Sequence, residues 1–155
     1  MKAKKQSSSS TVALMHLVVG GFVIPLIGYG LLYFALSALF PDIFETDRYE
    51  LLLEVASWAV ALALLIAGVI YSSDYIADTY VIKELRVIVI KSTYYFALLT
   101  SAGIILGFIL DDQATFAIQM INAAASILNV VVFYYVSQRF LPKAVLKHSQ
   151  KELDK

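Results

Sequence analysis

Residues 115–143, TFAIQMINAAASILNVVVFYYVSQRFLPK, form a membrane-length apolar stretch with regularly spaced polar side chains. At roughly 100° per residue, with residue 119 at zero, positions 122, 126 and 129 fall at roughly 300°, 340° and 280° on a helical wheel. Gln119, Asn122, Ser126 and Asn129 thus share about one quarter of a helix, and we call them the polar stripe. An amide facing lipid without a partner is costly, so we expect the polar stripe to face other helices, water or a polar ligand.

The polar stripe has two interpretations. It can be a packing element, because interhelical hydrogen bonds are common in membrane bundles and contribute about 0.6 kcal/mol each on average. It can instead line a groove for a polar headgroup, because intramembrane polar residues with ionisable groups nearby often mark a substrate path. Such groups are present, since Asp111 and Asp112 precede the stretch and Arg139 lies near its end.

The composition indicates an integral membrane protein with one domain. Hydrophobic residues make up 60% and charged residues 15% of the 155 positions, and the mean hydropathy is +0.77. A spanning helix needs about 20 apolar residues, so four spans with short loops nearly fill the chain and leave no room for a soluble catalytic domain. We therefore expect an all-α polytopic fold with four transmembrane helices and no enzymatic activity.

The chain divides into three predicted parts. Residues 1–11 contain three lysines and a run of serines with nothing to bury, which predicts a disordered basic tail. Residues 12–142 form the predicted four-helix domain, and residues 143–155 form a basic C-terminal tail. The apolar run 12–40 is too long for the core of a signal peptide, so we interpret it as a retained first span.

Small residues at helical spacing predict where helices pack closely, because they let two backbones approach each other. Each of the first three spans contains such a series, and the third has a G-x-x-x-G motif. The residues are Gly21, Gly28 and Ala35 in the first span, Ala59, Ala63 and Ala67 in the second, and Gly103 and Gly107 in the third.

Glu54 is an acidic residue at the start of the second span. Near the membrane boundary its carboxylate can reach the interface, so it can be an anchor, or it can be a coupling carboxylate. Between the second and third spans, the mixed charges of residues 72–91 predict a polar turn followed by a short interfacial helix.

The positive charges predict the orientation, because Lys and Arg are retained on the cytoplasmic side of a membrane. Only Arg48 lies on one side of the predicted spans. The other side holds Lys2, Lys4, Lys5, Lys83, Arg86, Lys91, Arg139, Lys143, Lys147, Lys151 and Lys155. We therefore expect both termini in the cytoplasm, the acidic loops outside, and the cytoplasmic membrane of a prokaryote as the location.

The sequence predicts no metal site, cofactor or nucleic-acid partner. It contains no cysteine, and its two histidines, His16 and His148, lie at opposite ends of the chain. It contains no glycine-rich phosphate loop and no recognisable nucleophile motif. Anionic lipid explains the basic tails more simply than a nucleic acid does.

Several motifs resemble those of the GtrA-like family, small four-span membrane proteins of polysaccharide synthesis and cell-envelope glycosylation. Residues 17–21 read LVVGG and residues 28–31 read GYGL, like the opening of that family. Residues 134–140, YYVSQRF, are similar to its N-F-x-x-N-R-aromatic signature, and residues 74–80, DYIADTY, form a looser copy. The two copies imply two repeated helix pairs. The sequence departs from the family in both copies. In residues 74–80, Thr79 replaces the arginine, and Asp74 and Asp78 replace amides. In residues 134–140, Tyr134 replaces an amide.

The resemblance implies that the protein transfers a polyprenyl-phosphate-linked sugar, or another lipid, from the inner to the outer leaflet. The polar stripe would then be the groove, with Glu54, Asp111 and Asp112 on the outer side. Cations at the inner mouth would bind the lipid phosphate, Arg139 foremost, although each lysine also fits ordinary positive-inside anchoring. The proposed phosphate-binding residues are Arg139, Lys143, Lys83, Arg86 and Lys91.

Two alternatives remain open. The protein can be a noncatalytic membrane subunit that anchors a glycosyltransferase or another complex, in which case the polar stripe is buried packing. A homo-oligomer of this chain is a further possible partner. The protein can also be a proton-coupled exporter of small cations that depends on Glu54.

The polar stripe covers only part of the membrane. At about 1.5 Å per residue, residues 119–129 extend about 15 Å, roughly half the hydrocarbon thickness. Residues 130–133, VVVF, separate the stripe from Arg139. We therefore expect a closed inner gate at these residues, with polar groups entering from the outer side until the first and fourth helices part.

Overall fold

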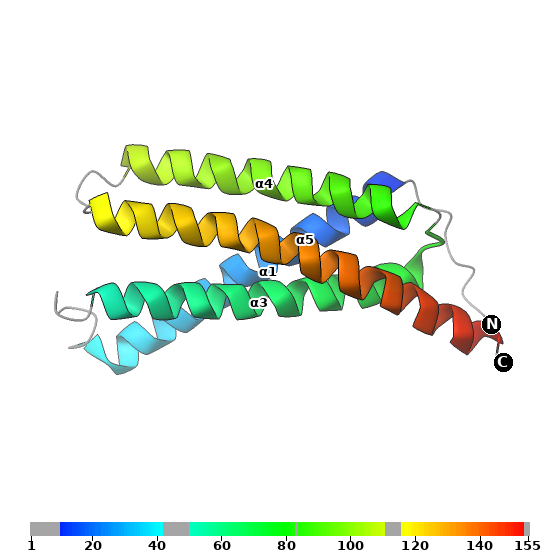
Figure 1. Ribbon diagram of the computed structural model, residues 1–155. Coiled ribbons are helices and arrows are strands. Elements are labelled where there is room, and N and C mark those ends of the chain that lie inside the picture. The colour runs from blue at the N-terminus through cyan, green and yellow to red at the C-terminus, as the bar shows by residue number, and fades with distance from the viewer. Residues whose placement is uncertain (1–9, 42–49, 83, 111–115, 154–155) are drawn as a thin grey trace.

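The computed structural model describes residues 10–41, 50–82, 84–110 and 116–153, and these ranges contain four long α-helices (Figure 1). They are α1 (Ser10–Leu39), α3 (Glu50–Thr79), α4 (Leu85–Leu110) and α5 (Phe116–Leu153). Each of the four is long and apolar enough to cross a membrane. The prediction of an all-α fold with four candidate spans is confirmed, and the chain is a polytopic membrane protein.

The helices run alternately up and down, so that the start of α1 and the end of α5 lie at the same end of the bundle (Figure 1). We call this the basic end, because it carries Arg86, Lys91, Arg139, Lys143 and Lys147. We call the opposite end, where α1 and α4 finish, the far end. Helices α3, α4 and α5 run alongside one another, whereas α1 crosses behind them (Figure 1). Along its length α1 contacts α3, from His16 beside Tyr75 to Tyr29 beside Ser57. It also packs against α4, where Phe22 meets Phe96.

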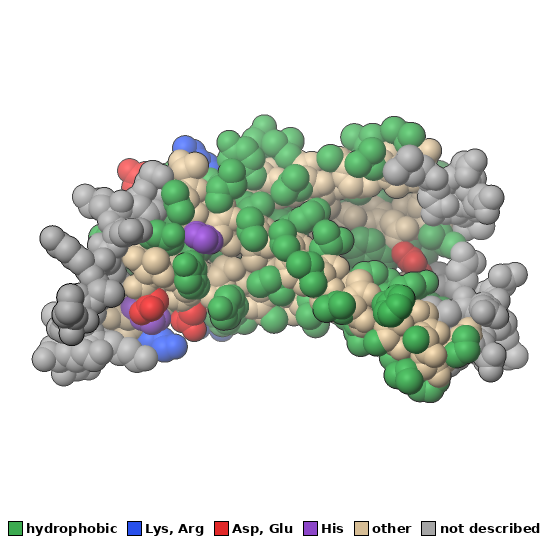
Figure 2. All heavy atoms as spheres, turned by 180° about the vertical axis from the view of Figure 1, so that it is seen from behind, with side chains coloured by type: hydrophobic (Ala, Val, Ile, Leu, Met, Phe, Trp, Pro, Cys, Tyr) green, Lys and Arg blue, Asp and Glu red, His purple; other side chains and the backbone are tan. Residues whose placement is uncertain are grey.

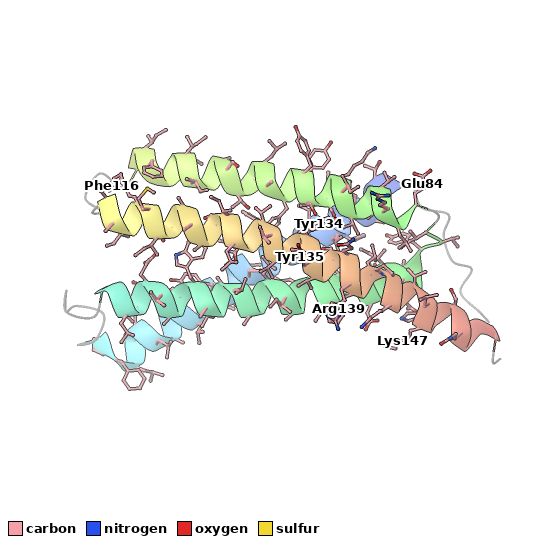
Figure 3. The ribbon with its side chains drawn as sticks, viewed as in Figure 1. Glu84, Phe116, Tyr134, Tyr135, Arg139 and Lys147 are labelled. Carbon is pink, nitrogen blue, oxygen red and sulfur yellow. The ribbon has the colours of Figure 1, made fainter. Side chains whose placement is uncertain are left out.

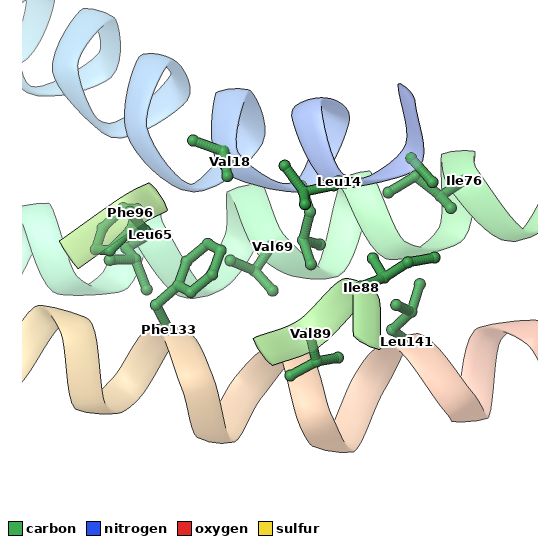
Figure 4. Close-up of a cluster of buried hydrophobic side chains, with 12 residues drawn as sticks. Leu14, Val18, Leu65, Val69, Ile76, Ile88, Val89, Phe96, Phe133 and Leu141 are labelled. Carbon is green, nitrogen blue, oxygen red and sulfur yellow. The ribbon is translucent and has the colours of Figure 1, made fainter. Parts of the chain in front are cut away.

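The packed core lies entirely toward the basic end (Figure 4). Its fully buried side chains come from all four helices, and Leu17, Val69, Ile88 and Phe133 are examples. We call the part that supplies this core, residues 10–25, 65–79, 85–96 and 126–144, the closed half. In the remainder, residues 26–39, 52–64, 97–109 and 116–125, none of the described side chains is buried. We call that part the open half.

Glycines allow α1 to cross close to α3 and α5 in the closed half. A Cβ added at Gly68 would collide with the backbone carbonyl of Gly20, and one added at Gly21 would press into the ring of Phe133. Gly28 is also in contact, since a Cβ there would lie 3.0 Å from a methyl of Leu64. The predicted close packing is therefore correct for Gly21 and Gly28.

The other small-residue predictions are wrong. The described surface exposes Ala35 and all three alanines of α3, Ala59, Ala63 and Ala67. In α4, a Cβ at Gly103 or Gly107 would meet nothing within 4 Å. Small residues at helical spacing permit two helix backbones to approach closely but do not cause them to do so. Beyond Pro25, α1 runs along α3, where Gly28 contacts Leu64, and it does not pack against Gly103 and Gly107 of α4.

The connection between α3 and α4 also differs from the prediction. In place of a short interfacial helix, α3 continues to Thr79 and α4 begins at Leu85. The polar residues at the end of α3 stay helical because they contact side chains of α5. Oδ1 of Asp74 lies 3.7 Å from Nζ of Lys147, and Oδ1 of Asp78 lies 3.3 Å from Nδ1 of His148. Helix α5 continues to Leu153, so the predicted basic tail of residues 143–155 is helical over most of its length.

Candidate functional site

A cavity of about 380 Å³ lies among the four helices, beside the packed core. All four residues of the polar stripe line it: Gln119, Asn122, Ser126 and Asn129. Ser126 is buried and the three amides are half-buried. The surface is hollowed toward the far end of the molecule, with an acidic side chain beside the hollow (Figure 2). The stripe thus faces a partly open space among the helices, while its part in moving a headgroup stays a prediction.

The remaining walls of the cavity are mostly apolar. Helix α1 contributes Phe22, Pro25 and Tyr29, and helix α4 contributes a face that includes Gly103 and Gly107. The two glycines make room, because no side chain projects from them into the space between α4 and its neighbours. The G-x-x-x-G motif of α4 therefore shapes a cavity wall and does not bring two helices together.

A stacked aromatic pair, Phe96 and Phe133, lies at the cavity wall on the side of the packed core (Figure 4), and Phe96 lines the cavity. The rings of Phe96 and Phe133 are parallel within 5°, with 4.3 Å between their centroids. Phe22 meets Phe96 edge-on at 6.3 Å, and Phe133 is fully buried. This layer contains Phe133 of the predicted gate. Phe96 was missed, because no pattern in the sequence shows which face of α4 meets α5.

Trp58 joins the cavity to Glu54. Its indole Nε1–H is shared between Oδ1 of Asn122, at 2.6 Å, and Oε1 of Glu54, at 3.0 Å. The carboxylate predicted as an anchor or a coupling group therefore sits one side chain away from the polar stripe. Sequence reasoning did not assign Trp58 to the site, although its spacing four residues after Glu54 places the two on one helix face.

Hydroxyl groups of the cavity wall are also bonded. Tyr29 donates to Oγ of Ser57 at 3.1 Å, which ties α1 to α3 at the open half. Thr100 donates to the carbonyl of Phe96, four residues earlier in α4, at 2.8 Å. Both hydroxyl oxygens keep lone pairs that can accept a further hydrogen bond.

Four of the predicted phosphate-binding residues lie in the described part of the chain, and none of the four lines the cavity. Arg86, Lys91, Arg139 and Lys143 are exposed toward the basic end. Figure 3 shows Arg139 on the part of α5 nearer that end, remote from Phe116 at the start of the helix. The aromatic layer lies between these cations and the polar stripe, so the structure does not bring the two sets together.

Three predicted residues, Lys83, Asp111 and Asp112, lie outside the described residues. Within the described part of the chain, no group of three or more His, Asp or Glu side chains is arranged to hold a metal ion. His16 lies beside two tyrosines and, among the described residues, belongs to no such group. Its Nε2 lies 3.1 Å from the hydroxyl of Tyr80, and its ring contacts that of Tyr75.

Comparison of the chain with protein-family models, with curated proteins and with solved structures finds no match. The resemblance to the GtrA-like family therefore stays a prediction from the motifs quoted above. A function has to be argued from the cavity and its surroundings.

Proposed function

We propose that this protein moves a lipid with a polar headgroup, such as a polyprenyl-phosphate-linked sugar, between the leaflets of a prokaryotic cytoplasmic membrane. The headgroup passes through the cavity while the apolar chain stays in the bilayer. One observation carries the proposal: the side chains of the polar stripe, Gln119 to Asn129, line one partly open cavity of about 380 Å³. No bond is made or broken, so the proposed activity is transport and not catalysis.

The shape of the site supports this proposal. Its volume lies within the range of small-molecule sites, about 300–1,000 Å³. The bare backbone at Gly103 and Gly107 leaves room beside α4 for an apolar chain to pass into lipid. A polar headgroup in this cavity exchanges its hydrogen bonds with water for bonds to the polar stripe, which lowers the cost of leaving the aqueous phase.

The charge distribution supports an orientation with the basic end in the cytoplasm. In that orientation the cavity faces the outer leaflet and the Phe96–Phe133 pair is the inner gate. Arg139, with the cations near it, would then gather the lipid phosphate at the inner leaflet.

Cysteine labelling tests the orientation, because the chain contains no cysteine of its own. A cysteine in place of Asp47 should react with an impermeant maleimide added outside intact cells. A cysteine in place of Ser149 should react only after the membrane is permeabilised. The reverse pattern would refute the orientation.

Transport tests the function directly. The protein is reconstituted in vesicles, and uptake of a short-chain isoprenyl-phosphate hexose is measured. Asn129→Leu should slow uptake about tenfold, because losing one hydrogen bond costs up to about 1.5 kcal/mol. The matched control is Gln138→Leu, which removes an exposed amide from the same helix outside the cavity and should transport normally. Equal rates for both variants and the unmodified protein would reject the groove.

The bond from Trp58 to Glu54 favours a second candidate, export of a small cation coupled to the Glu54 carboxylate. Transport assays in the same vesicles distinguish the cation exporter from the lipid transporter. Glu54→Gln would abolish proton-driven movement of a tetraalkylammonium ion if the exporter is correct, and would leave uptake of the lipid-linked hexose intact if the lipid transporter is correct. The noncatalytic membrane subunit predicts neither transport.

A further inference from the structure

Trp58 orients the amide of Asn122. An indole N–H can donate a hydrogen bond but cannot accept one, so the atom of Asn122 that faces it must be the carbonyl oxygen. The 2.6 Å bond from Nε1 to Oδ1 has this arrangement. The NH₂ group then projects from the other branch of the amide. Because Asn122 lines the cavity, this amide offers hydrogen-bond donors to a ligand.

Pro25 supplies an acceptor on the wall that α1 forms. Proline has no backbone N–H, so a proline inside a helix leaves the carbonyl four residues earlier without its helical partner. Pro25 lies inside α1, and the carbonyl concerned is that of Gly21. Both residues are buried and both line the cavity. Helix carbonyls point toward the C-terminus, which for α1 is the open half, so this acceptor is directed toward the cavity side of the aromatic layer.

The described residues that line the cavity include no Lys, Arg, Asp or Glu. A phosphate oxygen only accepts hydrogen bonds, so it would match Asn122 but would be repelled by the carbonyl of Gly21 and would find no cation. An ammonium group only donates, so it would match Gly21 but not the NH₂ group of Asn122. A hydroxyl group both donates and accepts, and it is compatible with both.

We infer that Trp58 and Pro25 are specificity-determining residues that make this cavity a site for a neutral, hydroxyl-bearing group, with donors from Asn122 and an acceptor at the carbonyl of Gly21. The inference rests on the proposed function in that the bound group is the sugar of the transported lipid. It adds that the sugar occupies the cavity while the phosphate stays outside it.

Trp58 also provides the measurement, because it is the only tryptophan in the chain. The full chain is placed in phosphatidylcholine nanodiscs, and its fluorescence is followed while octyl glucoside is added below the concentration at which it forms micelles. Octyl phosphate and octylammonium carry the same tail and serve as charged comparisons. We expect a saturable change with octyl glucoside at concentrations about tenfold or more below any change with the charged compounds, since each of those leaves a polar group unpaired. Equal or tighter binding of either charged compound would overturn the inference.

Two substitutions test the named residues. Pro25→Ala restores the N–H that pairs with the carbonyl of Gly21, and Asn122→Asp keeps an acceptor for Trp58 but removes the NH₂ donors. Each should weaken octyl glucoside binding about tenfold, as expected for one lost hydrogen bond. Pro142→Ala is the control for Pro25→Ala, because Pro142 lies inside α5 and outside the cavity. It should bind as the unmodified protein does.

Unchanged binding in Pro25→Ala, with helix content preserved by circular dichroism, would refute the role of Pro25. The experiments can refute the transport function and the specificity inference independently of each other. Normal octyl glucoside selectivity without uptake of the lipid-linked hexose would refute the transport function alone. Hexose uptake that is insensitive to Pro25→Ala and Asn122→Asp would refute the specificity inference alone.

Discussion

The closed half and the open half are made from the same four apolar helices, yet only one of them has a core. In the closed half, Leu17 and Phe133 are completely buried. In the open half, Leu31 and Ile109 each keep 68% of their surface exposed. In a bilayer, lipid tails are as apolar as leucine, so hydrophobicity does not hold spanning helices together. The comparison shows that packing in this protein depends on where backbones can approach and side chains can interlock.

The difference arises at the crossing of α1. Where Gly20 faces Gly68, the two backbones come together without intervening side chains. The rings of Phe96 and Phe133 then fill the space between α4 and α5. Beyond Pro25, α1 follows α3, so that Gly103 and Gly107 of α4 lack a packed neighbour. The cavity forms where the close packing ends.

The largest effect is expected from removing the aromatic layer. Phe133→Ala should lower the free energy of unfolding by about 3 kcal/mol, because truncating a buried phenylalanine loses its packing and leaves a void. Phe116→Ala is the control, since Phe116 is on the same helix but 74% exposed. It should cost less than about 0.5 kcal/mol. Both are measured by chemical unfolding in mixed micelles, and similar losses would contradict the distinction between the two halves.

A smaller loss is expected at the crossing itself. Gly68→Ala should destabilise the protein by about 1–3 kcal/mol, because its Cβ would meet the backbone of Gly20 and a backbone cannot move aside as a flexible side chain can. The same unfolding assay measures this change.

Gly103→Ala makes the same substitution in the open half. It should change the free energy of unfolding least, and it should raise it slightly where Gly68→Ala lowers it. A Cβ at Gly103 meets nothing within 4 Å, and alanine favours a helix interior over glycine by about 0.5–1 kcal/mol. If Gly103→Ala destabilises the protein as much as Gly68→Ala does, the G-x-x-x-G motif packs against another helix after all.

Much of the fold was predictable because it depends on local properties. The length and hydropathy of the apolar runs predicted four helices, and the spacing of Gln119, Asn122, Ser126 and Asn129 placed them on one face. The cost of exposing amides to lipid then indicated that this face turns inward. The contributions of Trp58, Phe96 and Pro25 to the cavity were not predictable in this way, because each depends on which helix face lies opposite.

The sequence by itself determined the helices, their apolar character and the polar face of α5, because these follow from hydrogen bonding within a segment and from the 3.6-residue period. Only the tertiary structure decided which small residues touch, where the core stops and what faces the polar stripe. Trp58 and Asn122 are 64 positions apart, and so are His16 and Tyr80. Such pairs form only after α1 has crossed α3 at Gly20 and Gly68, and the position of that crossing is set by the packing of whole helices.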